Sequence, residues 1–144
     1  MADRELIFIG SSTEKLSHAE ELVTALVQSQ GHFVTPILWT DQSLWNAGSF
    51  TLESLIKATE KFSFAAFFAA KDDPIVYRGA QQFSTRANIW FEAGIFMAKN
   101  GRQSVFILID EDDFQDLHIP SDLYGLSIFT YKVHDNNNPK SMES

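Results

Sequence analysis

Five short apolar runs, separated by helical patterns or long polar segments, most strongly constrain the fold of this chain. The runs show little alternation of polar and apolar residues; the third reads SFAAFFAA and is apolar after its first residue. A strand that is apolar on both sides has to be covered on both faces, which is typical of parallel sheets. The predicted strands are Arg4–Gly10, Phe33–Trp39, Ser63–Ala70, Ser104–Asp110 and Leu126–Tyr131.

The segments between these runs predict the helices of an α/β domain. Apolar residues recur at spacings of three and four in Ser11–Gly31, and helices are also predicted in Thr51–Phe62 and Arg86–Lys99. This alternation predicts a flavodoxin-like fold: a five-stranded parallel sheet in the order 2-1-3-4-5 with helices on both faces. Pro36 has no amide hydrogen to donate to a neighbouring strand, so the second strand is expected at an edge or a bulge.

The carboxyl ends of the predicted strands lead into long polar segments that should gather at one edge of the sheet. In doubly wound sheets this edge is where ligands bind. We expect Trp39–Phe50, Lys71–Thr85 and Asp110–Asp122 to be loops there, the last with one helical turn and an acidic, solvated stretch at Glu111–Asp113. His18, on the first predicted helix, is expected to be solvated.

Composition excludes several classes of function. The 144 residues suit one domain, and 44% hydrophobic residues suffice for a core, but no apolar run is long enough to span a membrane. Cysteine is absent, which excludes disulfides and thiol chemistry. A net charge of −8 without a basic stripe argues against nucleic-acid or anionic-membrane partners. No signal peptide is recognisable, so a cytoplasmic protein is expected.

Glu92 is a lone carboxylate in the predicted helix RANIWFEAGIFMAK, whose other side chains are apolar around most of its circumference. No Lys or Arg stands three or four positions away, and burial of an unpaired carboxylate is unfavourable and raises its pKa. Either Glu92 pairs with a distant arginine or faces water, or it lines a pocket and handles a hydroxyl-bearing substrate. Asn88 shares its helix face, and Arg86 stands where it can meet a phosphate.

The remaining motifs narrow the chemistry to that of one carboxylate. There is no P-loop, GxGxxG or GxSxG motif, and the histidines lack metal-ligand spacing, so we expect no metal or cofactor. Glycosidic bonds are usually cleaved by two carboxylates, but one suffices when the leaving group needs no protonation. Nicotinamide leaving NAD⁺ is such a group, because its pyridinium ring is already cationic. The turn GSST after the first strand can hold an anion, although many such turns hold nothing.

The chain resembles bacterial TIR-like domains of the kind described as predicted nucleotide-binding proteins. FIGSSTE, LWTD, TLESLIKA, KDD, RANIWFEAGIFMAKNGR and IPSDLYGL occur in the order seen there, over roughly Glu5 to Tyr131. The resemblance implies a TIR fold, NAD⁺ glycohydrolase activity with NAD⁺ as substrate, and Glu92 as the catalytic residue. It also implies NAD⁺ or substrate-site roles for further residues: Phe8, Ser11, Ser12, Trp39, Asp41, Arg78, Arg86, Asn88 and Asp122.

The same resemblance implies partners. Members act as effectors of CBASS and Pycsar anti-phage systems, fused to a cyclic-nucleotide sensor such as a STING or SAVED module, and become active when they self-associate. This chain departs from the family in having Ala87 where an Asp is common, and it contains no sensor. We expect residues 1–132 to form the TIR-like domain and residues 133–144 to be a polar tail or linker. The alternatives are a non-catalytic TIR adaptor and an enzyme like nucleoside deoxyribosyltransferases.

Overall fold

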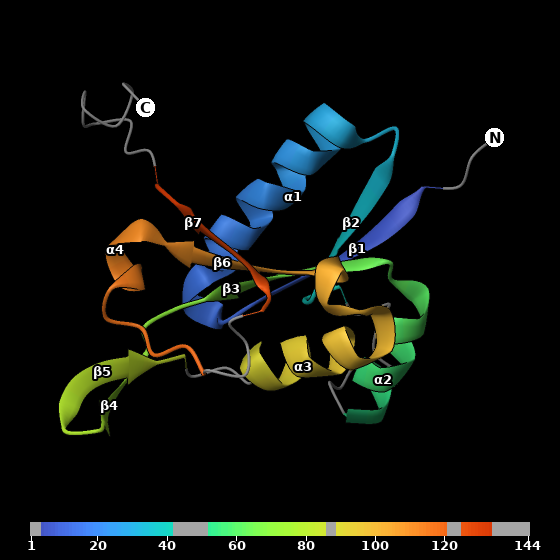
Figure 1. The fold of residues 1–144 in the computed structure, drawn as a ribbon. Coiled ribbons are helices and arrows are strands. Elements are labelled where there is room, and N and C mark those ends of the chain that lie inside the picture. Colours follow the sequence, from blue (N-terminus) through green and yellow to red (C-terminus); the bar gives the residue numbers. More distant parts are fainter. Residues whose placement is uncertain (1–3, 42–51, 86–88, 121–124, 134–144) are drawn as a thin grey trace, which may run out of the picture.

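A five-stranded parallel sheet forms the centre of the computed structural model (Figure 1). The structure describes residues 4–41, 52–85, 89–120 and 125–133. Every neighbouring pair of strands in this sheet runs in parallel. The strands are β1 (Glu5–Ser11), β2 (Val34–Leu38), β3 (Phe64–Ala69), β6 (Val105–Asp110) and β7 (Ser127–Tyr131).

The strands lie in the order β2-β1-β3-β6-β7. Counted within this sheet alone, that is the predicted order 2-1-3-4-5. The labels differ because two further strands, which the sequence did not predict, come between β3 and β6. Pro36 lies in β2 at the sheet edge, as expected for a residue that cannot donate to a second neighbouring strand. The flavodoxin-like fold predicted from the sequence is confirmed.

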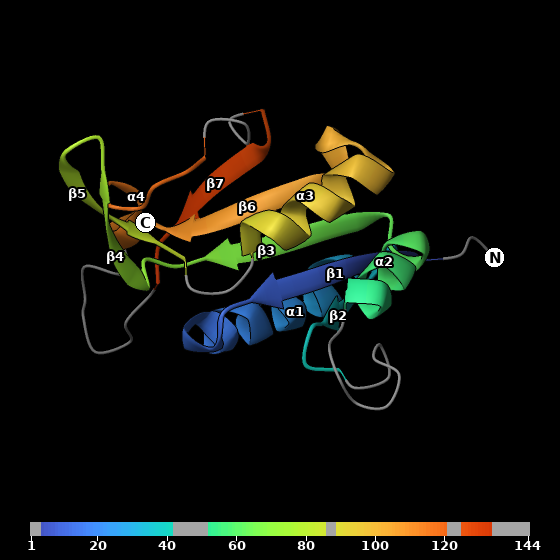
Figure 2. The same ribbon diagram turned by 90° about the horizontal axis from the view of Figure 1, so that it is seen from below.

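Helices cover the sheet on its two faces (Figure 2). α1 packs on one face against a core cluster that includes Ile9 and Phe68. α2 and α3 pack against each other on the opposite face, over the larger cluster that includes Phe8, Phe67 and Phe96. The helical elements are η1 (Thr13–Lys15), α1 (Leu16–Gln30), α2 (Leu52–Lys61), α3 (Ile89–Asn100), η4 (Arg102–Ser104) and α4 (Glu111–Phe114).

Aromatic packing fixes α3 onto β1. The rings of Phe8 and Phe96 stack with centroids 5.2 Å apart, and Phe67 meets Phe96 edge-on at 5.7 Å. Gly10 is required beside this cluster, because a Cβ there would lie 2.7 Å from the Phe67 ring. The N-terminal turn of α3, which carries Glu92, is therefore held by rigid core side chains.

Lys71–Thr85 was expected to be a loop, and this expectation was wrong. The segment contains an antiparallel hairpin of β4 (Asp73–Tyr77) and β5 (Ala80–Ser84). Its two-residue turn places Arg78 and Gly79 at positive φ, 52° and 80°, as a primed hairpin turn requires. Phe83 also bridges to Leu117, which ties the hairpin to the segment after α4.

The single helical turn expected in the acidic segment is present as α4. The side chain of Asp110 caps it by accepting a hydrogen bond from the Asp112 amide at 3.0 Å. Within the part of the chain that the structure describes, no helix has both the length and the apolarity to cross a bilayer.

Candidate functional site at the carboxyl edge of the sheet

Glu92 lies in the first turn of α3. The sequence suggested that this helix is buried on all sides, but it is not. Ile89, Ala93 and Phe96 face the core, whereas the Phe91 side chain is 57% exposed. Glu92 flanks the buried stripe and is half-buried. The apolar residues that made the helix look wholly internal are therefore divided between the core and the surface.

Burial raises the pKa of Glu92 to about 7, from 4.5 for a solvated glutamate. Desolvation of the carboxylate is the cause. The ion pairs found among the described residues do not include Glu92. The raised pKa expected for a buried carboxylate is therefore present, whereas the choice between a distant arginine partner and a substrate pocket stays open, because Arg86 is not among the described residues. A carboxylate of this kind in a helix N-terminal turn marks a candidate functional site.

The end of β1 contributes two buried serines next to the end of β2. Ser11 and Ser12 are 7% and 4% exposed. The Ser11 hydroxyl oxygen accepts a hydrogen bond from the Trp39 indole Nε1 at 2.8 Å, which joins two of the predicted site residues. Ser12 Oγ is buried without a hydrogen-bond partner among the described residues.

Other predicted site residues lie in different settings. Phe8 is fully buried, with its ring packed against Phe62, Phe67 and Phe96 in the core. Asp41 is exposed just after β2, where its amide donates to the Leu38 carbonyl. Their roles beside a nucleotide stay predictions.

Arg78 lies in the turn of the β4–β5 hairpin, which projects from the sheet (Figures 1 and 2). It is exposed, and its guanidinium lies 5.4 Å from the centre of the Tyr77 ring. Arg86, Asn88 and Asp122 lie outside the described residues, as do positions 42–50 of the expected loop Trp39–Phe50 and positions 134–144 of the expected tail 133–144.

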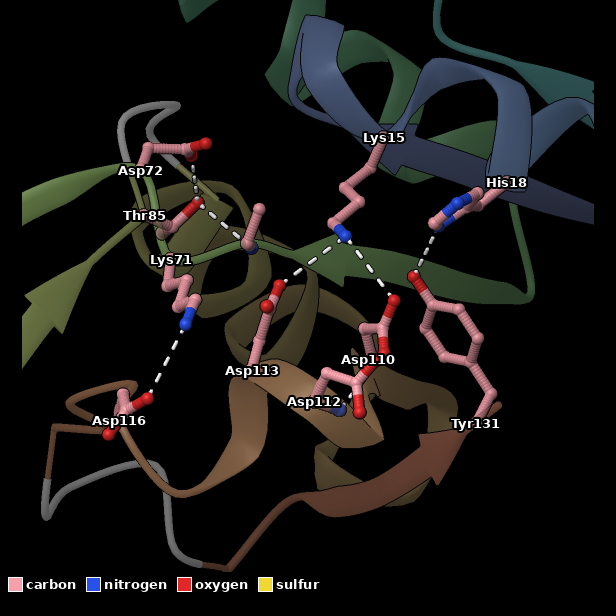
Figure 3. A network of polar contacts seen from close by, with 11 residues as sticks. Lys15, His18, Lys71, Asp72, Thr85, Asp110, Asp112, Asp113, Asp116 and Tyr131 are labelled. Atoms are coloured by element: carbon pink, nitrogen blue, oxygen red, sulfur yellow. Dashed lines mark hydrogen bonds and ion pairs between the residues drawn. The ribbon is translucent and has the colours of Figure 1, made fainter. Parts of the chain in front are cut away.

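An ion-pair network that the sequence did not predict also lies at this edge (Figure 3). Lys15 Nζ, from η1, lies 3.5 Å from Asp110 and 3.3 Å from Asp113. Glu111–Asp113 was expected to be solvated, but Asp113 is only 8% exposed, so for that residue the expectation was wrong. The pairing depends on the parallel order that puts β1 two strands from β6, which the sequence around Lys15 does not reveal.

His18 was expected to be solvated, but its side chain is only part-exposed and contacts Tyr131. Its Nδ1 lies 2.7 Å from the Tyr131 hydroxyl, and the two rings meet nearly edge-on. Burial, and then the carboxylates of Asp110, Asp113 and Glu21, raise the pKa of Tyr131, so it stays a neutral phenol. In residues 4–41, 52–85, 89–120 and 125–133, no group of three or more His, Cys, Asp or Glu side chains could hold a metal ion.

The flavodoxin-like parallel sheet, with a desolvated glutamate in the helix after β5, is the arrangement of a TIR domain. Residues 6–133 match the sequence family described as "CAP12/Pycsar effector protein, TIR domain". The chain belongs to this family.

Curated relatives agree with the family match. A CD-NTase-associated protein 12 from Sphingobacterium faecium is 34% identical over 125 residues, which is 87% of this chain and 36% of that protein. The Pycsar effector protein PaPycTIR from Pseudomonas aeruginosa is 32% identical over 127 residues, 88% of this chain and 37% of its own. The Pycsar effector protein XpPycTIR from Xanthomonas perforans is 30% identical over 130 residues, which is 90% of this chain and 41% of that protein. The chain thus spans less than half the length of these relatives.

Proposed function

We propose that this domain is an NAD⁺ glycohydrolase effector that cleaves the bond between nicotinamide and ribose, with Glu92 as the catalytic residue. The observation that carries the proposal is the half-buried Glu92 in the first turn of α3, whose pKa burial raises to about 7. Such a group exists in appreciable amounts as a poorly solvated carboxylate near neutral pH. Its charge then acts strongly on a cationic centre that forms beside it.

The chemistry needs only one carboxylate. When the C1′–N bond breaks, its electron pair goes to the pyridinium nitrogen, and nicotinamide leaves as a neutral molecule. Positive charge develops on the ribose ring as in an oxocarbenium ion. The Glu92 carboxylate stabilises that charge and accepts a hydrogen bond from a ribose hydroxyl, and water then attacks C1′ and loses a proton. General-acid assistance to the leaving group, which most glycosidases need, is not required.

The end of β1 and β2 supports a role in holding the substrate. The Ser12 hydroxyl is buried without a hydrogen-bond partner among the described residues, and the Trp39–Ser11 hydrogen bond fixes the neighbouring strand ends. We extend the binding role to Asp41 and Arg78, and to Arg86, Asn88 and Asp122 outside the described residues, because the family resemblance implies them.

We further propose that activity depends on assembly and serves anti-phage defence. The relatives are named as CD-NTase-associated or Pycsar effectors, and this chain covers 36–41% of those described above. A cyclic-nucleotide sensor of the kind that the family resemblance implies would drive self-association of the TIR domains. The isolated domain is then expected to have low activity.

The test is nicotinamide release from NAD⁺ by the domain at high concentration or fused to an oligomerising tag, beside Glu92→Gln. Gln keeps the shape of the side chain and removes the charge, so cleavage should fall by about a thousandfold or more while the circular dichroism spectrum is unchanged. Product analysis separates ADP-ribose from a cyclised product. Release at the same rate from wild type and Glu92→Gln would remove Glu92 from the mechanism.

The same assay separates the alternatives. A non-catalytic adaptor would associate without releasing nicotinamide, even when light scattering shows that it is assembled. A deoxyribosyltransferase-like enzyme would exchange bases between a deoxynucleoside and a free nucleobase.

A further inference from the structure

A buried threonine joins the end of β3 to the segment that enters α3. Thr85 directly follows β5 and is 8% exposed. Its hydroxyl oxygen accepts a hydrogen bond from the amide of Ala70, just after β3, at 3.5 Å. The same hydroxyl donates to Asp72 Oδ2 at 3.3 Å (Figure 3). The hydroxyl thus uses its proton and a lone pair on two different positions of the chain.

The backbone at the base of the β4–β5 hairpin is hydrogen-bonded on two sides. The Asp72 amide donates to the Ser84 carbonyl oxygen at 3.0 Å, which ties the entry of the hairpin to its exit. On the other side, the Phe83 amide donates to the Asp116 carbonyl oxygen at 2.8 Å, and the His118 amide donates to the Phe83 carbonyl oxygen at 2.7 Å. The exit of β5 is therefore held between the end of β3 and the segment after α4.

The exit of β5 limits where α3 can begin. Only three residues separate Thr85 from Ile89, the first residue of α3, so the connection has little slack. The N-terminal turn of α3, which carries Glu92, is the end of the helix nearest the hairpin (Figures 1 and 2). The aromatic core holds α3 farther along, through Phe96. The first turn of α3 thus lies between two anchors, the core and Thr85.

The other end of this connection lies beside the serines that we propose to hold the substrate. Phe68 of β3 pairs with Ser11 of β1, two positions before Ala70. The Thr85 hydroxyl therefore links the start of the helix that carries Glu92 to the strand next to Ser11. Misplacement of a catalytic group by about 1 Å can lower a rate by about a hundredfold, so a link at this point bears on catalysis.

Two other buried hydroxyls act more locally. Thr59 donates to the Ile56 carbonyl oxygen within α2, and Ser104 donates to the Gly101 carbonyl oxygen within its own turn. Thr85 instead joins residues 15 and 13 positions away. Thr59 is 1% exposed, so it offers a matched comparison: a buried, hydrogen-bonded threonine whose hydroxyl does not join distant segments.

We propose that Thr85 and Asp72 are positioning residues, whose hydrogen bond and contact with the Ala70 amide set the place of the first turn of α3, and so of Glu92, relative to the end of β3. Asp72 accepts the hydroxyl proton of Thr85 and so turns the oxygen lone pairs towards the Ala70 amide. Both residues act through Glu92 rather than on the substrate. The inference rests on the proposed function in taking Glu92 as the group that acts on NAD⁺.

Kinetics of the full 144-residue chain, assembled by an oligomerising tag, test the proposal. Thr85→Val keeps the shape of the side chain and removes the hydroxyl. The kcat for nicotinamide release should then fall by about tenfold to a hundredfold, while KM changes by less than about threefold. Thr85→Ser keeps the hydroxyl and should recover most of the loss.

Thr59→Val is the matched control. It also removes one buried hydroxyl, so it should lower the melting temperature about as much as Thr85→Val does, but leave kcat unchanged. A kcat for Thr85→Val that is no lower than that of Thr59→Val would overturn the positioning role.

A double-mutant cycle tests whether the two residues act as a pair. Asp72→Asn should lower kcat in the wild-type background and have little further effect in Thr85→Val, because the hydrogen bond is already absent there. Equal losses in the two backgrounds would overturn the pairing of Asp72 with Thr85.

A measurement without NAD⁺ separates this inference from the proposed function. The carboxyl-carbon resonance of Glu92, followed by NMR as a function of pH, should have its midpoint near pH 7 in the wild type and in Thr59→Val, because burial raises the pKa to about 7. In Thr85→Val the first turn of α3 is less firmly held, so water reaches the carboxylate and the midpoint should move towards 4.5.

The two failures can therefore be told apart. A midpoint that moves in Thr85→Val, without nicotinamide release from any of the proteins, supports the positioning role and contradicts the proposed NAD⁺ cleavage. Wild-type release with neither the midpoint nor kcat changed in Thr85→Val supports NAD⁺ cleavage and contradicts the positioning role.

Discussion

The indole Nε1 of Trp39 donates a hydrogen bond to Ser11 Oγ over 2.8 Å, which joins the ends of β2 and β1 at the carboxyl edge of the sheet. β2 is an edge strand whose residues are only half-buried, so few core contacts hold its end. The hydrogen bond adds a directional link between residues 28 positions apart. It places the start of the following segment relative to the two buried serines.

Replacement of Trp39 by Phe should therefore destabilise the domain by about 1 kcal/mol, because Ser11 loses a hydrogen-bond donor in a buried position. Ser11→Ala should have a similar effect, and the double variant should be little worse than either single one. Urea unfolding of the four proteins measures this coupling. Strictly additive effects would show that the hydrogen bond does not couple the two strand ends.

Stability should depend on pH through Glu92. The pKa of this group is about 7 in the folded protein and 4.5 when solvated, so between these values the folded state holds a proton that the unfolded chain has released. The contribution of Glu92 to the free energy of unfolding is therefore greatest below about pH 4.5. It falls as the pH rises towards 7, by at most about 3 kcal/mol in total. Urea unfolding at several pH values measures this pH dependence. Glu92→Gln is the control, and its free energy of unfolding should vary less with pH. An identical profile for both proteins would contradict the raised pKa.

Nicotinamide release should depend on pH in the opposite direction. The proposed mechanism uses ionised Glu92, so the rate should rise with pH and level off above a midpoint near 7 in the free enzyme. The initial slope of rate against NAD⁺ concentration, measured for the assembled domain from pH 5 to 9, reports this value. A midpoint near 4.5 would mean that Glu92 is solvated in the active assembly.

Lys15 should be important for stability although it was not predicted as a site residue. Its side chain is 15% exposed and neutralises two carboxylates, Asp110 and Asp113, which are themselves 13% and 12% exposed. Lys15→Met keeps the apolar stem but leaves two largely buried carboxylates without their cation, so unfolding should become easier by about 2 kcal/mol. Lys15→Arg keeps the charge and should recover most of the loss. Thermal unfolding of the wild type and the two variants is the measurement. Equal melting temperatures for Lys15→Met and the wild type would show that Lys15 does not stabilise the fold.

Sequence periodicity predicted most of the fold because it reports local burial. The five strands of the main sheet were found within a residue or two of their bounds, and the order followed from the general behaviour of apolar parallel strands. The β4–β5 hairpin was missed because DPIVY and AQQFS are short and only partly apolar. The hairpin is stabilised by the pairing of β4 with β5 and by the bridge from Phe83 to Leu117. That bridge joins residues more than thirty positions apart and leaves no local pattern in the sequence.

The sequence by itself determined that Glu92 stands alone among apolar neighbours, because charge spacing along a helix is a local property. Only the tertiary structure decided how far that carboxylate is desolvated, since α3 buries one stripe and leaves Phe91 in water. The same holds for Asp113, which sequence placed in a solvated turn and the fold placed against Lys15. Burial and ion pairing depend on which distant strands become neighbours, and that is fixed only when the sheet assembles.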